Sequence, residues 1–271
     1  MTKSKLWIVS SVLATGLASG VAANGEEHFK ASAKTAVPRP KLVVNSARDQ
    51  ILPFVYDGNG WSTNFVISNL DSHTIVVHME FLANDGSALS LPLNGIGYTT
   101  ALDVTIPYGG TYSIATSDID AAQASGYAFM AATNGSDLFG AYGVTRLQSA
   151  NLPDLEMSVP LTPIDENFFN LSFDNTNGYS TRAVLINSSS QNSAIVNLSV
   201  QDSQGNVLAT DQITIAPYAR YPFNLGDYYP VAGIVGNVYF AANGQQYVAG
   251  SALRIGPNQS LAIVPVQSLP R

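Results

Sequence analysis

The chain of 271 residues contains no cysteine. A disulfide framework, a thiolate metal site and a lipid-modified cysteine are therefore excluded. The folded part must be stabilised by its apolar core alone. The chain is long enough for one large domain or two ordinary ones.

Lysine is absent from residue 49 onward, where five arginines stand against 17 acidic residues. A surface of that sign repels phosphate backbones, so no nucleic-acid partner is expected. Residues 28–48 are different, because they carry five basic residues and no acid. Together with the prolines Pro38 and Pro40, this predicts a flexible lead-in over residues 24–49, although such a tail could also contact an anionic surface.

An apolar stretch is found at the start of the chain, with no comparable stretch later. Two lysines precede the run from Leu6 to Val21, and small residues surround Ala23. This pattern predicts a secretory signal peptide over residues 1–23 and a secreted, periplasmic or cell-envelope product without a transmembrane segment. An uncut anchor is the alternative, but the run is shorter than the roughly 20 residues that span a bilayer.

One short phrase occurs twice. "GWSTNFVISN" at Gly60–Asn69 is matched by "GYSTRAVLIN" at Gly178–Asn187. The segment from His73 then aligns with the segment from Asn192, at an offset of 119 residues. The matches continue in the same order through "TIPYGGTY" and "TIAPYARY", so the sequence predicts a tandem duplication rather than a solenoid, whose units are shorter.

The duplication predicts two similar domains, over residues 50–163 and 164–271. Apolar residues alternate within each copy, with Val76, His78, Glu80 and Leu82 on the opposite face of the first. The alternating apolar positions are Ile75, Val77, Met79 and Phe81 in the first copy and Ala194, Val196, Leu198 and Val200 in the second.

A period of two with frequent Asn-Gly and Asp-Gly turns predicts all-β sandwiches of the Ig-like type, about seven strands each. The doubled phrase is interpreted as the opening hairpin of each domain.

The combined sequence pattern is specific enough to compare with known proteins. Gly-Trp/Tyr-Ser-Thr, Val-Ile/Leu-x-Asn, an Asp/Gln-Gly turn, Thr-Ile-x-Pro-Tyr and a closing Val-Pro run through about residues 50–268. This pattern resembles uncharacterised secreted bacterial proteins built from paired β-sandwich (Ig-like) repeats. The resemblance implies the architecture and an envelope or extracellular setting, and it implies no catalytic residue.

Residues for catalysis are scarce. His73 and His78 occur in the first copy only, and no Gly-x-Ser-x-Gly elbow, Ser-x-x-Lys pair or phosphate loop is found. Glycosidases need two facing carboxylates, but Glu80 and Glu156 correspond to Ser199 and Leu261 in the second copy. We therefore expect no enzyme, with a glycan hydrolase the least favoured reading.

Acidic loops occur in both copies. "DGNGW" contains Asp57 and Asn59, and "DNTNGY" contains Asp174 and Asn177. Oxygen ligands of this kind suit calcium, although Asp and Asn are also preferred turn residues. No cofactor is expected, with calcium as the alternative.

Loop aromatics also recur. Trp61 corresponds to Tyr179, and Tyr108 corresponds to Tyr218. If these four rings are exposed, they could stack on sugars as in a carbohydrate-binding module. The favoured function is a non-catalytic structural or adhesive protein with an extracellular protein or polysaccharide as partner, and self-association through a strand edge is also possible.

Overall fold

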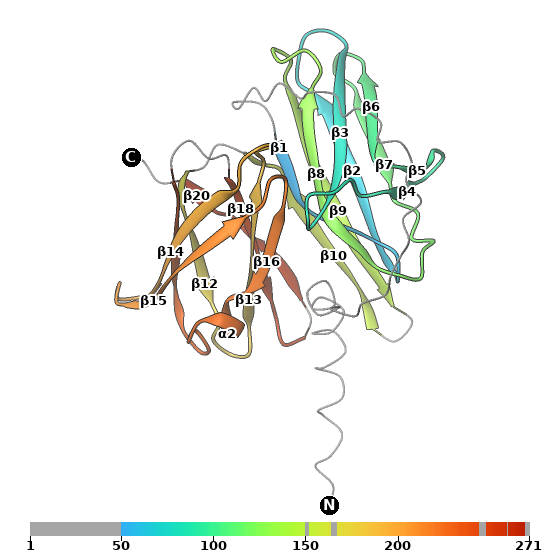
Figure 1. Cartoon of the computed structure of the whole chain (residues 1–271). Coiled ribbons are helices and arrows are strands. Elements are labelled where there is room, and N and C mark those ends of the chain that lie inside the picture. The colour runs from blue at the N-terminus through green and yellow to red at the C-terminus, as the bar shows by residue number, and fades with distance from the viewer. Residues whose placement is uncertain (1–49, 150–151, 164–166, 244–247, 259, 269–271) are drawn as a thin grey trace, which may run out of the picture. The chain divides into compact units, whose positions relative to one another are not determined.

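The computed structural model describes residues 50–149, 152–163, 167–243, 248–258 and 260–268 (Figure 1). The predicted signal peptide and lead-in, residues 1–49, lie outside the described residues. No helix among the described residues is long and apolar enough to cross a membrane. The described residues belong to one compact unit.

The first half, residues 50–163, forms antiparallel sheets. One sheet has the order β11-β1-β8-β3-β6, the facing one has the order β10-β9-β2-β7, and β4 pairs with β5. The strands are β1 (Gln50–Asp57), β2 (Trp61–Asn69), β3 (Ile75–Ala83), β4 (Leu91–Leu93), β5 (Gly97–Thr99), β6 (Ala101–Ile106), β7 (Thr111–Ala115), β8 (Ala124–Ala132), β9 (Phe139–Ser149), β10 (Leu152–Pro160) and β11 (Thr162–Pro163).

The second half, residues 167–268, adds two more sheets and one helical turn. The sheet orders are β15-β14-β17-β12-β20 and β16-β13-β18-β19. The elements are β12 (Phe168–Asp174), β13 (Ser180–Asn187), β14 (Ala194–Asp202), β15 (Val207–Ile215), β16 (Arg220–Asn224), α2 (Leu225–Tyr228), β17 (Val235–Ala242), β18 (Val248–Ile255), β19 (Leu261–Val264) and β20 (Gln267–Ser268). The all-β prediction is confirmed.

The strand order is the same in both halves when strands are matched in chain order. β1, β8, β3 and β6 lie together as β12, β17, β14 and β15 do, and β9, β2 and β7 lie together as β18, β13 and β16 do. This order differs from that of an Ig constant domain, in which the first two strands share a sheet. Here β1 pairs with β8, whereas β2 pairs with β7 and β9.

The link between β1 and β2 corrects one sequence prediction. The phrase beginning at Gly60 does not open a hairpin, because β1 and β2 lie in different sheets. Gly58, Asn59 and Gly60 all have positive φ, at 79°, 54° and 86°. This left-handed run turns the chain from one sheet into the other, a conformation that glycine and asparagine adopt most readily.

Each pair of sheets encloses an apolar core. In the second half, one buried cluster joins Phe169 and Val238 of one sheet to Leu185 and Ala252 of the other. In the first half, the ring centroids of Phe65 and Phe81, from facing sheets, lie 5.4 Å apart. The two halves are therefore compatible with β-sandwiches.

The predicted alternation is confirmed in β3 and β14, with one exception. Every position predicted as apolar is buried in both strands. Leu82, predicted on the wet face, is fully buried instead. The segment that follows β3 folds back over it, since Leu82 forms a β-bridge with Ala88 and the Leu89 amide donates to the Phe81 carbonyl.

Two glycines in matching strands allow close backbone approach. A Cβ on Gly126 would lie 2.1 Å from the Leu82 carbonyl oxygen, and one on Gly236 would lie 2.0 Å from that of Gln201. Only glycine fits at such distances. The repeated glycine at the start of β8 and β17 is therefore required by strand pairing.

Arg220 of β16 makes hydrogen bonds from the second half to the first. Its Nε donates to the Pro53 carbonyl at 3.0 Å and its Nη1 to Asn84 Oδ1 at 2.7 Å. The side chain is 4% exposed, and its guanidinium lies 5.4 Å from the Phe54 ring centroid. These contacts link the two halves of the described chain.

Candidate functional site

The four aromatic residues predicted as a sugar platform have different surroundings. Trp61 is 4% exposed and packs on Tyr56, with ring centroids 5.0 Å apart. Tyr179 is half-buried, with the guanidinium of Arg254 3.7 Å from its ring centroid. Trp61 is therefore not accessible for sugar stacking, and Arg254 covers one face of Tyr179.

The remaining two aromatics lie in equivalent turns but differ in exposure. Tyr108 is 72% exposed. Tyr218 is half-buried with a φ of 56°, and its carbonyl accepts a hydrogen bond from the Tyr127 hydroxyl at 2.8 Å. The four predicted rings therefore do not form one open face, because Trp61 is buried.

The calcium candidates of the first half do not converge. Asp57 is fully buried, and its Oδ1 accepts from the Asp118 amide at 3.0 Å. Burial raises the pKa of Asp57, and the Thr116 hydroxyl partly offsets this. Asn59 is exposed with positive φ, as expected of a turn residue.

The calcium candidates of the second half are engaged locally. Asp174 Oδ2 pairs with Arg254 Nη2 at 2.6 Å, and Asp174 Oδ1 accepts from the Thr176 hydroxyl and amide. The Thr176 hydrogen bonds, followed by Arg254, lower the pKa of Asp174. Asn177 is an exposed turn residue with a φ of 53°.

A different trio has metal-like spacing among the described residues. Asp71, His73 and Asp137 place ligand atoms within 4.8 Å of one another. The two ring nitrogens of His73 lie 3.1 Å from Asp71 Oδ1 and 3.2 Å from Asp137 Oδ1, so these three side chains satisfy one another. None of the four calcium candidates belongs to this trio.

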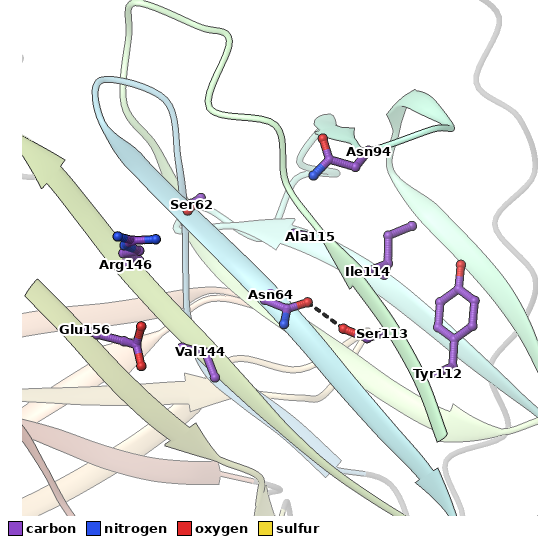
Figure 2. Close-up of a pocket in the computed structure, with 10 residues that line it drawn as sticks. All are labelled: Ser62, Asn64, Asn94, Tyr112, Ser113, Ile114, Ala115, Val144, Arg146 and Glu156. Atoms are coloured by element: carbon purple, nitrogen blue, oxygen red, sulfur yellow. Dashed lines mark hydrogen bonds between the residues drawn. The ribbon is translucent and has the colours of Figure 1, made fainter. Parts of the chain in front are cut away.

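A polar hollow lies on the outer face of the sheet β10-β9-β2-β7 (Figure 2). Its volume is about 560 Å³, within the range of small-molecule sites. The outward residues of neighbouring strands form its floor. Register places Ser62 opposite Arg146, and Arg146 opposite Glu156. The lining residues are Ser62, Asn64, Asn94, Tyr112, Ser113, Ile114, Ala115, Val144, Arg146 and Glu156.

Alternation along the strands explains why the floor is polar. In β2 the odd-numbered residues are buried and the even-numbered ones, including Ser62 and Asn64, face outward. The Ser113 hydroxyl donates to Asn64 Oδ1 at 2.9 Å, as Figure 2 shows. That bond holds the amide oxygen in place, while the Asn64 amide nitrogen has no hydrogen-bond acceptor among the described residues.

Charge in the hollow is paired at one end. Arg146 forms an ion pair with Asp154 on the neighbouring strand, and this contact lowers the pKa of Asp154. Arg254 in the second half likewise forms an ion pair, with Asp174. Glu156 is exposed beside Arg146. The hollow therefore presents a carboxylate, a guanidinium, amides and hydroxyls.

A segment without a counterpart in the second half forms the rim of the hollow. Residues 84–100 join β3 to β6, whereas residues 203–206 join the matching strands β14 and β15. This insertion carries the β4–β5 hairpin, and it is fixed by hydrogen bonds from Asn94 N to the Ala115 carbonyl and from the Ser117 hydroxyl to Asn94 Oδ1. Asn94 is thereby held beside β7.

A difference in length between the two copies marks this rim in the sequence. The offset between the copies is 119 at His73 and 109 at Thr105, so the first copy carries ten more residues between these points. Insertions in a repeat frequently map to a binding face. The position of the hollow could not be predicted, because it depends on the register of four strands, which does not follow from the sequence pattern.

Comparison with known proteins identifies no relative. No protein-family model matches the chain, and no curated protein matches it. Among solved structures, a chain of "Structure of infectious bursal disease virus Gx strain" has a TM-score of 0.22 and 11% identity, over 83% of this chain. The match spans 64% of that viral chain, and so low a score supports no argument about fold or function.

Proposed function

We propose that this chain is a non-catalytic, adhesive β-sandwich protein that binds a glycan in the hollow over β10, β9, β2 and β7. The observation that carries the proposal is the chemistry of that hollow. Outward Asn64, Asn94 and Ser62 offer amide and hydroxyl groups, and Arg146 and Glu156 add charged partners. A polyhydroxylated ligand matches such a mixed set of donors and acceptors.

Aromatic residues near the hollow support the same ligand class. Tyr112 contributes to the lining. Tyr142 lies on the same outer face, opposite Val66 in the register of β2 and β9, and is 46% exposed. An exposed phenol ring beside polar groups provides the apolar face and polar handle that sugar rings use. These tyrosines replace the four rings predicted from sequence.

The lining contains one carboxylate, and the neighbouring Asp154 is ion-paired with Arg146, which supports binding without turnover. Glycosidases need two facing carboxylates, and Glu156 is the one carboxylate among the lining residues. In the described part of the chain, the side-chain hydrogen bonds of His73 and His78 go to aspartates and none goes to a serine, so no Ser-His pair is assembled. The proposal therefore assigns no catalytic residue.

The proposal includes a duplicated origin and an extracytoplasmic location. Identical strand order in the two halves supports duplication of one sandwich, with boundaries near residues 50–163 and 164–271. Export is supported by the leader-like residues 1–23. The mass of the exported product tests that part, since intact Met1 on membrane-bound material would favour an uncut anchor.

A glycan array with the purified full chain tests the function. We expect saturable binding to at least one glycan. The double substitution Asn64→Ala with Glu156→Ala should weaken it by roughly 5- to 100-fold, as for two lost hydrogen bonds. The matched control is Asn197→Ala, which removes an outward amide from β14 in the second half and should leave binding unchanged.

Three outcomes would contradict the proposal in different ways. No retained glycan would leave a purely structural module as the better account. Binding that survives the double substitution would place the site elsewhere, and hydrolysis of a retained glycan would refute the non-catalytic assignment. Circular dichroism of each variant verifies that it is folded.

A further inference from the structure

A second hollow lies in the second half, against the edge strands β15 and β16 and the turn α2. Its volume is about 190 Å³, below the range of about 300–1,000 Å³ typical for drug-sized ligands. It therefore suits a headgroup or the end of a side chain. The lining residues are Asp211, Gln212, Ile213, Thr214, Tyr221, Phe223, Tyr228 and Tyr229.

Four of these residues are aromatic, and their rings meet at steep angles. Phe223 lies edge-on to Tyr228 and Tyr229, with centroids 6.2 and 6.5 Å apart and interplanar angles of 83° and 85°. Tyr221 is tilted by 47° against Phe223 at 5.6 Å. Rings at such angles form walls around the hollow rather than one flat stack.

A carboxylate lies at the rim of this space. Asp211 is exposed, and its Oδ2 accepts a hydrogen bond from the Tyr229 hydroxyl at 3.1 Å. Burial and then this hydrogen bond raise the pKa of Tyr229, so the phenol stays neutral and donates. No basic residue is among the lining residues, and the described chain has arginines but no lysine.

We infer that this hollow, here called the aromatic hollow, binds an alkylated ammonium group. Aromatic faces attract such cations through the ring quadrupole, and a nearby carboxylate adds a direct charge interaction. A sugar hydroxyl could donate to the carboxylate, but a sugar lacks the cationic charge that aromatic faces attract. The inference concerns a different half and different residues from the glycan proposal, so neither depends on the other.

The first half lacks the same arrangement, which argues for a specific role. Ile114 of β7 corresponds to Phe223 of β16. The two residues pair with Phe65 and Ala183, which are equivalent positions of the doubled phrase. The α2 turn that supplies Tyr228 follows β16, whereas no helix follows β7 in the described first half. Only the second half therefore assembles the ring walls.

Titration of the full chain with choline tests the inference, with binding followed by ligand-observed NMR. Two further probes test which interaction drives binding and which kind of molecule carries the ammonium group. The uncharged isostere 3,3-dimethylbutan-1-ol tests whether the charge is needed, and a trimethyllysine peptide tests whether a protein side chain can supply the group. We expect choline, the peptide or both to bind, and the alcohol to bind at least tenfold more weakly.

Two substitutions locate the site. Tyr228→Ala and Asp211→Asn should each weaken choline binding by roughly 2- to 30-fold. Tyr228 is 56% exposed, so its truncation leaves the core intact, and a thermal melt verifies folding. The matched control is Tyr98→Ala, because Tyr98 is exposed to a similar extent, at 58%, and donates to Asp120 at 2.7 Å, as Tyr229 donates to Asp211, but is not part of the aromatic hollow.

The possible results decide the inference. Loss in both variants of the aromatic hollow but not in Tyr98→Ala would support it. Equal affinity for choline and the alcohol would show an apolar hollow instead. Absence of binding to both cations at millimolar concentration, or binding unchanged by the two substitutions, would overturn it.

Discussion

Asn187, the last residue of the doubled phrase, joins three segments of the second half. Its side chain is fully buried. Its Nδ2 donates to the carbonyls of Asn192, Ile215 and Ala216 at 2.8, 3.1 and 3.1 Å. Its Oδ1 accepts from the Ser189 amide at 3.0 Å.

Two substitutions at Asn187 separate the loss of the amide from the addition of a charge. Asn187→Ala removes about three net hydrogen bonds, and we expect the free energy of unfolding to fall by about 2–4 kcal/mol. Asn187→Asp keeps the shape but places a carboxylate against three carbonyl oxygens. An uncompensated buried charge should cost about 3–5 kcal/mol at neutral pH.

The two variants should differ in their dependence on pH. Burial raises the pKa of the introduced carboxyl above its unfolded value. The extra penalty of Asn187→Asp is therefore full above that raised pKa and shrinks as the pH falls through it, since the protonated group can again donate. Asn187→Ala introduces no titratable group, so its deficit should not change in this way.

Urea unfolding followed by fluorescence at pH 7 and pH 4 measures these differences. Asn192→Asp is the matched control, because Asn192 is exposed in the same loop and its substitution should change stability by less than about 0.5 kcal/mol. Wild-type stability for Asn187→Asp at pH 7 would refute the reasoning. Asn69→Asp repeats the test in the first half, where the amide bridges the His73 and Ile106 carbonyls.

Two other predictions concern glycine and a buried acid. Gly236→Ala should destabilise the fold by about 1–3 kcal/mol or more, because its Cβ would meet the Gln201 carbonyl at 2.0 Å; an unchanged melting temperature would show that β14 and β17 can separate freely. Asp57→Asn should gain stability relative to wild type at pH 7 and lose that advantage as the pH falls. The raised pKa of Asp57 means that its ionised form is penalised in the fold only above that pKa, so a constant difference across pH in parallel melts would argue against an ionised Asp57.

The local sequence pattern predicted the structural features that depend on residues close together in the chain. Alternation identified the buried positions of β3 and β14, because successive strand side chains point to opposite faces. The doubled phrase pointed to matching elements in the two halves, and β2 and β13 end at Asn69 and Asn187, two amides with matching hydrogen bonds. These features follow from period and turn chemistry alone.

Features that depend on pairing between distant strands required the tertiary structure. The sequence could not place β1 and β2 in different sheets, because a short glycine turn is compatible with either a hairpin or a crossing. It also could not show that Trp61 is buried while Tyr142 is exposed, since aromatic residues suit both environments. The polar hollow joins β2, β7, β9 and β10 through register, and the aromatic hollow joins β15, β16 and α2. Strand register and loop packing bring these residues together, and neither is encoded in any single stretch of the sequence.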